Sequence, residues 1–270
     1  MENKIALCFI ISGKHILNKE EIWREWIDAN KDLINVYFHY SNLSKISSSW
    51  VRSHSMPKEK TVRTSYYHIV PAYMTLLEYA ISQDSQNKWF CFLTDSCAPI
   101  VSPAKFKEMF SKHSEKSVFK WQHASWNASF SKRANLKYLP EKYRLSHDPW
   151  FILTKIDAEL CLRFIKEKHQ VYLKICAGII ANESVFAIIL KIYKRLQFVV
   201  NGKGHITDFH RMSSSTSPYV FQSASLQDIK YIRAEKEKNE YAMFVRKVAT
   251  TFPDSILRRL AFPPLAAINA

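Results

Sequence analysis

Short apolar runs bounded by polar turns alternate along the chain with segments in which apolar residues recur at helical spacing. The runs Ile5 to Ile11, Ile34 to Tyr40 and Trp89 to Leu93 predict buried strands, because strands covered on both faces are apolar almost throughout. Alternation of such strands with amphipathic helices is typical of a sheet covered by helices. The pattern therefore predicts an α/β fold with a mixed, mostly parallel sheet flanked by helices.

Weaker patterns complete this prediction. Shorter apolar runs predict strands over Val118 to Trp121, Trp150 to Thr154 and Val171 to Ile175. Helical spacing predicts helices over Asn18 to Ala29, Thr64 to Ile81, Pro103 to His113, Asp157 to Lys168, Glu183 to Arg195 and Leu226 to Asn239. We expect Asn18 and Asn182 to cap the helices that follow them. The Ser- and His-rich stretches Asn42 to Lys60 and Asn201 to Pro218 predict long loops.

The length of 270 residues fits one large domain, since single folds usually end near ~250 to 300 residues. We expect a single domain over residues 1–260 and an apolar, Pro-broken tail over residues 261–270. A hydrophobic share of 47% excludes a disordered protein. No apolar stretch reaches the ~20 residues that a membrane-spanning helix needs. The five cysteines show no CxxC spacing, so we expect free thiols.

Charge changes the picture, because 39 Lys and Arg against 24 Asp and Glu give a formal net charge of +15. Such a surface should attract an anionic partner, whether nucleic acid, acidic lipid or a phosphorylated small molecule. The chain contains only four glycines, and neither GxGxxG nor a P-loop occurs. The cations are spread along predicted helices, partly interleaved with acids, so a nucleic-acid partner is not expected.

Glu183 is the acid with the strongest case for chemistry. One interpretation is a carboxylate that complements a helix dipole. The other is a general base at the mouth of a cleft, because α/β sites form where a helix begins after a strand. Arg246 and Lys247 beside an apolar stretch are either a solvated pair or an anion site that holds a diphosphate, and Arg211 is a further candidate.

A catalytic metal is not expected. A metal-dependent nucleotide-sugar transferase would show an Asp-x-Asp pair after a buried strand, whereas the segment LTDSCAPI carries a single acid, Asp95. His205, Asp208 and His210 are close in sequence but lack the spacing of a helical zinc site.

At this point a family resemblance is visible. From Ile5 to about Pro253 the chain resembles the core-2/I-branching β-1,6-N-acetylglucosaminyltransferase family, which also contains the peptide O-xylosyltransferases. The resemblance rests on ordered blocks: KIALCFIISG, VYFHY, YYHIVPAYMTLLEYA, WFCFLTDSCAPIVSP, HDPWFILTK, ANESVFAIIL, HITDF, SPYVF and AMFVRKV. LTDSCAPI and the ordered pair ANES and FVRK are the most specific of them.

The resemblance implies a GT-A-like catalytic domain and inverting, metal-independent transfer from a UDP-sugar. In such a site, Glu183 would deprotonate the acceptor hydroxyl. Lys247, with Arg246 beside it and Arg211 as the upstream arginine, would neutralise the diphosphate in place of a metal.

Further residues follow from the same resemblance. His39, Arg63 and Asp95 are expected on the donor side. Phe209 is expected to stack on the acceptor sugar, and Trp126 and Trp150 either line the acceptor site or pack in the core. The expected donor is UDP-N-acetylglucosamine, with UDP-xylose as the alternative and a catalytically inactive nucleotide- or glycan-binding module as the rival.

The expected partners are a UDP-sugar donor and a glycan or protein hydroxyl acceptor, without a cofactor and without nucleic acid. The remaining basic surface could support loose association with a membrane surface. The chain lacks the N-terminal anchor of the animal Golgi enzymes and carries free thiols, which favours a cytoplasmic location in a bacterial or viral setting.

Overall fold

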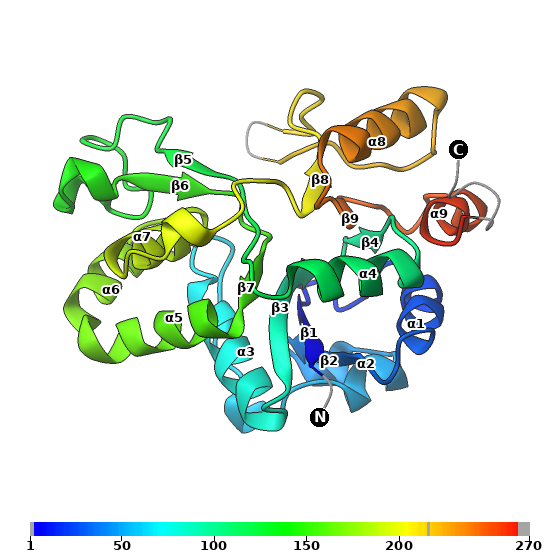
Figure 1. Cartoon of the computed structure of the whole chain (residues 1–270), viewed down its shortest axis with the longest axis horizontal. Coiled ribbons are helices and arrows are strands. Elements are labelled where there is room, and N and C mark those ends of the chain that lie inside the picture. The colour runs from blue at the N-terminus through cyan, green and yellow to red at the C-terminus, as the bar shows by residue number, and fades with distance from the viewer. Residues whose placement is uncertain (1–2, 215–216, 264–270) are drawn as a thin grey trace.

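A four-stranded sheet forms the centre of the computed structural model, which describes residues 3–214 and 217–263 (Figure 1). The strands β2 (Ile34–His39), β1 (Lys4–Ile10) and β3 (Asn87–Thr94) are parallel, and β7 (Ile152–Thr154) pairs antiparallel with β3. The prediction of an α/β fold with a mixed, mostly parallel sheet is confirmed. Its three principal strands lie within one or two residues of the predicted ranges.

One face of the sheet is covered by α1 (Glu20–Asp28) and α4 (Pro103–His113). Leu7 and Phe9 of β1 point to this face, because successive side chains of a strand point to opposite sides of the sheet. The ring of Phe9 packs edge-on against Trp23 of α1, with centroids 5.0 Å apart. This contact holds α1 against the end of β1 that leads to the candidate site.

The other face is covered by an all-helical layer, which lies on the opposite side of the sheet from α4 in Figure 1. It consists of α3 (Val70–Gln83), α5 (Lys155–Glu167), α6 (His169–Cys176) and α7 (Val185–Ile192). Residues 185–190 of α7 are all buried, as expected of a helix that is apolar on every side. Cys8 of β1 belongs to the same cluster. This layer fixes the segment that precedes α7.

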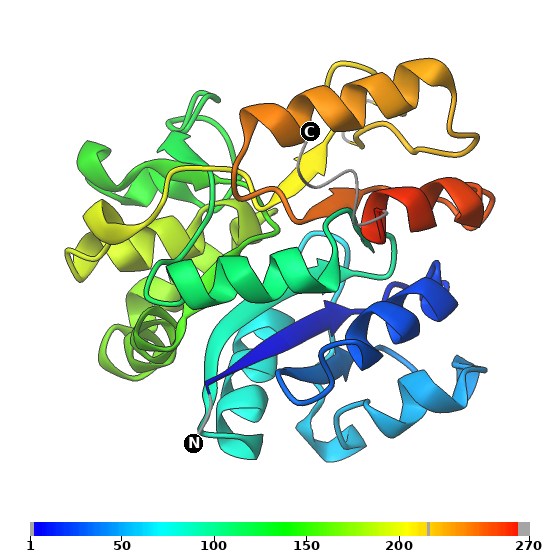
Figure 2. The ribbon, with the colours of Figure 1, turned by 45° about the vertical axis from the view of Figure 1, so that its right-hand side comes forward.

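A second, three-stranded sheet lies beside the first and has the order β4-β9-β8. Its strands are β4 (Ala98–Pro99), β9 (Phe244–Arg246) and β8 (His205–Thr207), with β9 parallel to β8 and antiparallel to β4. The helices α8 (Leu226–Lys238) and α9 (Asp254–Ala261) pack against it, and α9 also lies against α1 (Figure 2).

Smaller elements join these layers. The strands β5 (Trp121–His123) and β6 (Leu145–His147) form an antiparallel pair, and α2 (Ser49–Ser53) follows β2. Short 3₁₀ turns cover Leu43–Lys45, Lys58–Lys60, Leu136–Tyr138, Glu141–Tyr143, Ala181–Glu183 and Leu196–Phe198. The predicted loop from Asn42 to Lys60 therefore contains a helix and two turns, and the predicted loop after Asn201 contains β8.

The prediction of a strand over Val171 to Ile175 is wrong, because these residues belong to α6. The run of β-branched and aromatic residues favoured a strand, but its two buried side chains, Tyr172 and Ile175, are three residues apart, which is helical spacing. The predicted strand from Val118 is also displaced. Val118 forms only isolated bridges, and the regular strand there begins at Trp121.

Both predicted asparagine caps are wrong. Lys19, in a left-handed conformation, precedes α1, and Nδ2 of the Asn18 side chain instead donates to the Val248 carbonyl at 2.7 Å. Asn182 and Glu183 lie in a 3₁₀ turn, and α7 begins only at Val185. Glu183 therefore stands before the helix and not in its first turn.

Within the described part of the chain, no helix is long and apolar enough to cross a membrane. Residues 264–270 of the predicted tail lie outside the described residues.

Candidate active site

The candidate site lies at the carboxyl ends of the parallel strands β1 and β3, an edge at which open α/β sheets bind ligands. Asp95 follows β3, and its Oδ2 accepts a hydrogen bond from the Ser12 amide after β1 at 2.9 Å. The Val248 amide after β9 donates to the Ser96 carbonyl at 2.8 Å. These two bonds bring three segments that are distant in sequence to one edge of the sheet.

The start of β7 reaches the same edge because β7 runs opposite to β3. The Phe92 amide donates to the Phe151 carbonyl at 2.9 Å, which places Trp150 beside the end of β3. Trp150 is buried and stacks on Tyr73 of α3, with ring centroids 5.7 Å apart. Its indole Nε1 has no hydrogen-bond partner among the described residues. Trp150 thus packs in the core on one ring face and offers a donor on its edge.

Two cations lie at this edge of the sheet, because Arg246 is the last residue of β9 and Lys247 follows it directly. Arg246 is only 8% exposed, and its Cζ lies 5.0 Å from the centre of the Trp150 ring. Its Nε is unpartnered, and no described carboxylate forms an ion pair with it. Burial lowers the pKa of Arg246, and burial followed by repulsion from Arg246 lowers the pKa of Lys247. The Lys247 Nζ lies 3.5 Å from the Ser217 Oγ. The site therefore holds two cations that form no ion pair with a carboxylate in the described part of the chain.

Glu183 faces this charge from the other side. Its Oε2 lies 2.5 Å from Nη2 of Arg133, and its side chain is 29% exposed. Burial raises the pKa of Glu183, while Arg133 and then Arg246 act in the opposite direction. No described residue forms a hydrogen bond with Oε1. One oxygen of this partly desolvated carboxylate is thus fixed, and the other is left for a ligand.

Arg133 reaches Glu183 through a close approach of two backbones. The Ala134 amide donates to the Ile179 carbonyl at 2.9 Å, and the Ile179 amide donates to the Lys132 carbonyl at 3.1 Å. A Cβ atom on Gly178 would lie 2.4 Å from the Asn135 nitrogen, so only glycine permits this approach.

The Arg133 guanidinium also stacks on an aromatic ring. Its Cζ lies 4.2 Å from the centre of the Trp126 ring, within the range of a cation–π interaction. Trp126 is half-buried, and its Nε1 has no partner in the described part of the chain. Trp126 therefore supports the arginine that holds Glu183.

A small cleft opens beside Arg246. Its lining comes from three segments: Asp148, Pro149, Trp150, His205, Thr207, Phe209 and Arg246. Phe209 is 53% exposed at this cleft, as an aromatic platform for a sugar would be. Burial lowers the pKa of His205 to about 3, so its imidazole is neutral.

Asp148 is a second carboxylate in this cleft. Burial raises its pKa to about 6, against the opposing effect of Lys203, and Glu183 raises it further. Its carboxyl oxygens have no hydrogen-bond or ion-pair partner among the described residues. Like Glu183, it is a partly desolvated acid with room for a ligand.

The sequence prediction missed Arg133 and Asp148. Asp148 stands two residues before the predicted strand in HDPWFILTK, a position that could have marked it. Arg133 lies in the polar segment SFSKRANL, which carries no motif, and it meets Glu183 only through the fold. A contact between residues 50 positions apart leaves no local pattern.

Three of the predicted donor residues lie apart from this arrangement. His39 is buried at the end of β2, where its Nε2 accepts from the Val62 amide at 3.2 Å and burial lowers its pKa to about 4. Arg63 is exposed on the segment after α2. Arg211 pairs with Asp208 at 2.7 Å and with Asp228 at 2.8 Å, and it stacks on Tyr219 at 4.0 Å. Two carboxylates therefore already neutralise Arg211.

No group of three or more His, Cys, Asp or Glu side chains that could hold a metal ion occurs in residues 3–214 and 217–263. Asp95, the acid of LTDSCAPI, accepts its hydrogen bond from a backbone amide.

A desolvated carboxylate with one free oxygen, near cations without ion-pair partners among the described residues, fits an enzyme that transfers a group from an anionic donor. Comparison with known families agrees with this class. The model of the Core-2/I-Branching enzyme family matches residues 7–233. The chain therefore belongs to the Core-2/I-Branching enzyme family and is a glycosyltransferase.

Fifty-two chains of solved structures match the fold. One is described as the crystal structure of a glycosyltransferase involved in the glycosylation of the major capsid of PBCV-1. The match has 11% sequence identity and a TM-score of 0.38, and covers 90% of this chain and 94% of that one. No functionally curated protein matches the sequence significantly.

Proposed function

We propose that the chain transfers N-acetylglucosamine from its UDP-sugar to a hydroxyl group of a glycan or protein acceptor, with inversion and without a metal. The observation that carries this proposal is the Glu183 carboxylate, which keeps one oxygen free near Arg246, a buried cation without an ion-pair partner among the described residues. A single domain over residues 1–260 would carry the whole reaction.

Glu183 acts as the general base in this mechanism. Arg133 holds Oε2, and the free Oε1 takes the proton of the acceptor hydroxyl as its oxygen attacks the anomeric carbon. The bond from that carbon to the diphosphate oxygen breaks on the opposite face, so the configuration inverts. The electron pair of the broken bond leaves with UDP.

Arg246 and Lys247 stabilise the departing diphosphate. Buried cations act more strongly than exposed ones because little water screens them, and the Arg246 guanidinium enters the site with an unpartnered N–H. Trp150 and Phe209 flank the small cleft beside Arg246, and the exposed ring of Phe209 offers an apolar face to a sugar ring. Arg211 is left out of this mechanism, because Asp208 and Asp228 already bind it.

Replacement of Glu183 by Gln tests the proposal. The amide keeps the shape of the side chain but cannot accept a proton, so we expect transfer to fall by ~100- to 10,000-fold. UDP release is measured with UDP-N-acetylglucosamine, UDP-xylose and UDP-glucose against a panel of acceptor sugars and peptides, and UDP affinity is measured separately by thermal shift.

The control variant is Glu159→Gln, which changes an exposed glutamate of α5. It should keep wild-type turnover, and both variants should bind UDP like the wild type. Turnover of Glu183→Gln within tenfold of the wild type would show that another group is the base. A wild-type enzyme that prefers UDP-xylose would change the proposed donor but not the assignment of the base.

A further inference from the structure

A segment with many unbalanced cations covers the open edge of the central sheet. The Met56 amide donates to the Phe38 carbonyl of β2 at 3.0 Å, and the Phe38 amide donates to the His54 carbonyl at 3.1 Å. Val51 and Met56 are each 1% exposed and anchor the segment in the core. Its outward side chains are therefore held by a fixed backbone.

The outward side chains are strongly basic. Between residues 33 and 77 the only acid is Glu59. The exposed cations of this stretch are Lys45, Arg52, Lys58, Lys60 and Arg63. No described carboxylate forms an ion pair with any of them, although some exposed lysines elsewhere, such as Lys105 and Lys238, are paired. The positive charge of this segment is thus available to a partner.

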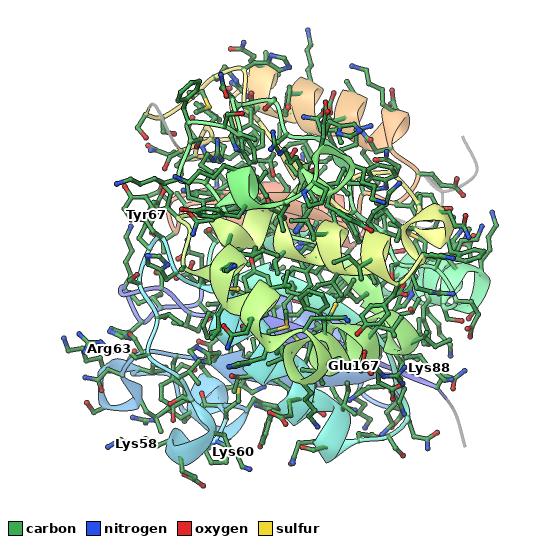
Figure 3. All side chains as sticks on the ribbon, turned by 90° about the vertical axis from the view of Figure 1, so that its left-hand side faces the viewer. Lys58, Lys60, Arg63, Tyr67, Lys88 and Glu167 are labelled. Atoms are coloured by element: carbon green, nitrogen blue, oxygen red, sulfur yellow. The ribbon has the colours of Figure 1, made fainter. Side chains whose placement is uncertain are left out.

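The segment leads to the candidate active site. The Tyr67 carbonyl accepts a hydrogen bond from the Ile180 amide at 2.9 Å, three residues before Glu183 in sequence. Tyr66 is 68% and Tyr67 46% exposed, and their rings meet edge-on. Figure 3 shows Lys58, Lys60, Arg63 and Tyr67 along one side of the molecule. We call Lys58, Lys60, Arg63, Tyr66 and Tyr67 the basic rim.

We propose that the basic rim binds an anionic acceptor, a glycan chain that carries carboxylate, sulfate or phosphate groups, and guides its hydroxyl group to Glu183. This inference rests on the proposed function, since the ligand of the rim is the acceptor of that reaction. The cations would pair with the anionic groups, and the tyrosine rings would pack against sugar rings, because tyrosine offers an apolar face and a polar end.

The geometry favours a chain over a membrane surface. The rim ends at Tyr67, whose carbonyl binds the Ile180 amide three residues before Glu183, so a chain bound along the rim is directed toward the proposed base. Its large exposed side chains are tyrosines that lie beside this end. A bilayer would contact the cations without presenting a hydroxyl group to Glu183.

The double variant Lys58→Glu/Lys60→Glu tests the rim by direct binding. The probes are a heparin decasaccharide, a galacturonic acid decamer and the neutral maltodecaose, with dissociation constants measured by calorimetry between 50 and 300 mM NaCl. We expect the wild type to bind the two anionic probes, the maltodecaose at least tenfold more weakly, and affinity for the anionic probes to fall as salt rises. The double variant should bind the anionic probes about 25-fold more weakly than the wild type, which is about fivefold for each cation replaced.

The matched control is Lys107→Glu/Lys230→Glu, which makes the same charge change at exposed positions of α4 and α8. Its affinity for the anionic probes should stay within threefold of that of the wild type. An equal loss in both double variants would overturn the proposal, because net charge alone would then explain binding. Equal binding of the neutral and anionic probes would also overturn it.

A third arm measures binding to vesicles that contain phosphatidylserine. Rim-dependent vesicle binding without oligosaccharide binding would assign the rim to a membrane and overturn the proposal. Failure of the proposed function has a different signature, since the wild type would then release UDP from no donor, whatever its affinity for the anionic probes.

Discussion

The site contains two carboxyl groups, Glu183 and Asp148, whose pKa values are raised by burial but whose side-chain contacts differ. Burial raises the pKa of both Glu183 and Asp148. Arg133 binds Glu183 directly and favours its ionised form, whereas no described cation pairs with Asp148. A general base has to be ionised before it can accept a proton, and the contact with Arg133 favours the ionised form of Glu183. The difference supports Glu183 as the base and leaves Asp148 to bind hydroxyl groups.

The stability of the protein should report the ionisation of Asp148. The pKa of its carboxyl is about 6 in the folded chain, above the ordinary 3.8. The folded state therefore binds this proton more tightly than the unfolded state, and the stabilisation is complete below pH ~4 and is lost as pH rises through about 6. Asp148→Asn removes this loss. Relative to wild type, the free energy of unfolding of the variant should increase by about 2 kcal/mol between pH 4.5 and 7.5.

Urea unfolding of both proteins at the two pH values measures this difference. Asp32→Asn, at an exposed position, serves as the control and should follow the wild type. A difference between Asp148→Asn and wild type that stays constant with pH would mean that Asp148 titrates normally.

At the scale of elements, Arg211 links the segment after β8 to α8. Its guanidinium binds Asp208, near the end of β8, and Asp228, in the first turn of α8, and both carboxylates are buried. Removing the arginine leaves two buried carboxylates without their shared cation. Breaking such an arrangement costs about 3 to 5 kcal/mol.

Arg211→Ala should therefore lower the free energy of unfolding by about 3 kcal/mol, measured by urea denaturation at pH 7.5. The triple variant Arg211→Ala/Asp208→Asn/Asp228→Asn should recover part of this loss, because it removes both unpaired charges. If Arg211→Ala kept full stability and instead lost UDP affinity, the arginine would belong to the donor site.

Elements with strong local signals could be predicted from the sequence, and elements defined by packing could not. The helix α4 has the predicted bounds, because Ser102 accepts from the Lys105 amide as its N-cap and Pro103 begins its first turn. α6 has no side-chain N-cap and packs through Tyr172 and Ile175, so its composition favoured the wrong element. The sequence motif ANES indicated Glu183 as a candidate, whereas its partner Arg133 could be identified only from the three-dimensional structure.

For the whole molecule, the cations behind the net charge of +15 form two groups, one on the surface and one at the candidate site. The exposed part includes the basic rim, while Arg246 and Lys247 are a small buried or half-buried part at the site. Only the second part acts on the diphosphate in the proposed mechanism. It occupies the electrostatic role that a divalent cation has in metal-dependent transferases.

Chelation should therefore leave transfer intact. With UDP-N-acetylglucosamine as donor, UDP release in 5 mM EDTA should stay within about twofold of that in Mn²⁺, because Arg246 and Lys247 supply the positive charge. A loss of more than tenfold in EDTA that Mn²⁺ restores would contradict the metal-free mechanism, and Mg²⁺ provides the comparison for a general effect of ionic strength.

Because β9 lies late in the sequence, it is synthesised after most of the central sheet. The strands β1, β2 and β3 leave the ribosome early, yet the cations of the candidate site reside on β9 and directly after it. The hydrogen bond from the Asn18 side-chain amide to the Val248 carbonyl can also form only after synthesis of Val248, which is 230 residues later in the chain. A nascent chain can thus form most of the parallel sheet long before it has the groups proposed to bind a diphosphate. In a growing chain, donor binding would mark the completion of nearly the whole domain.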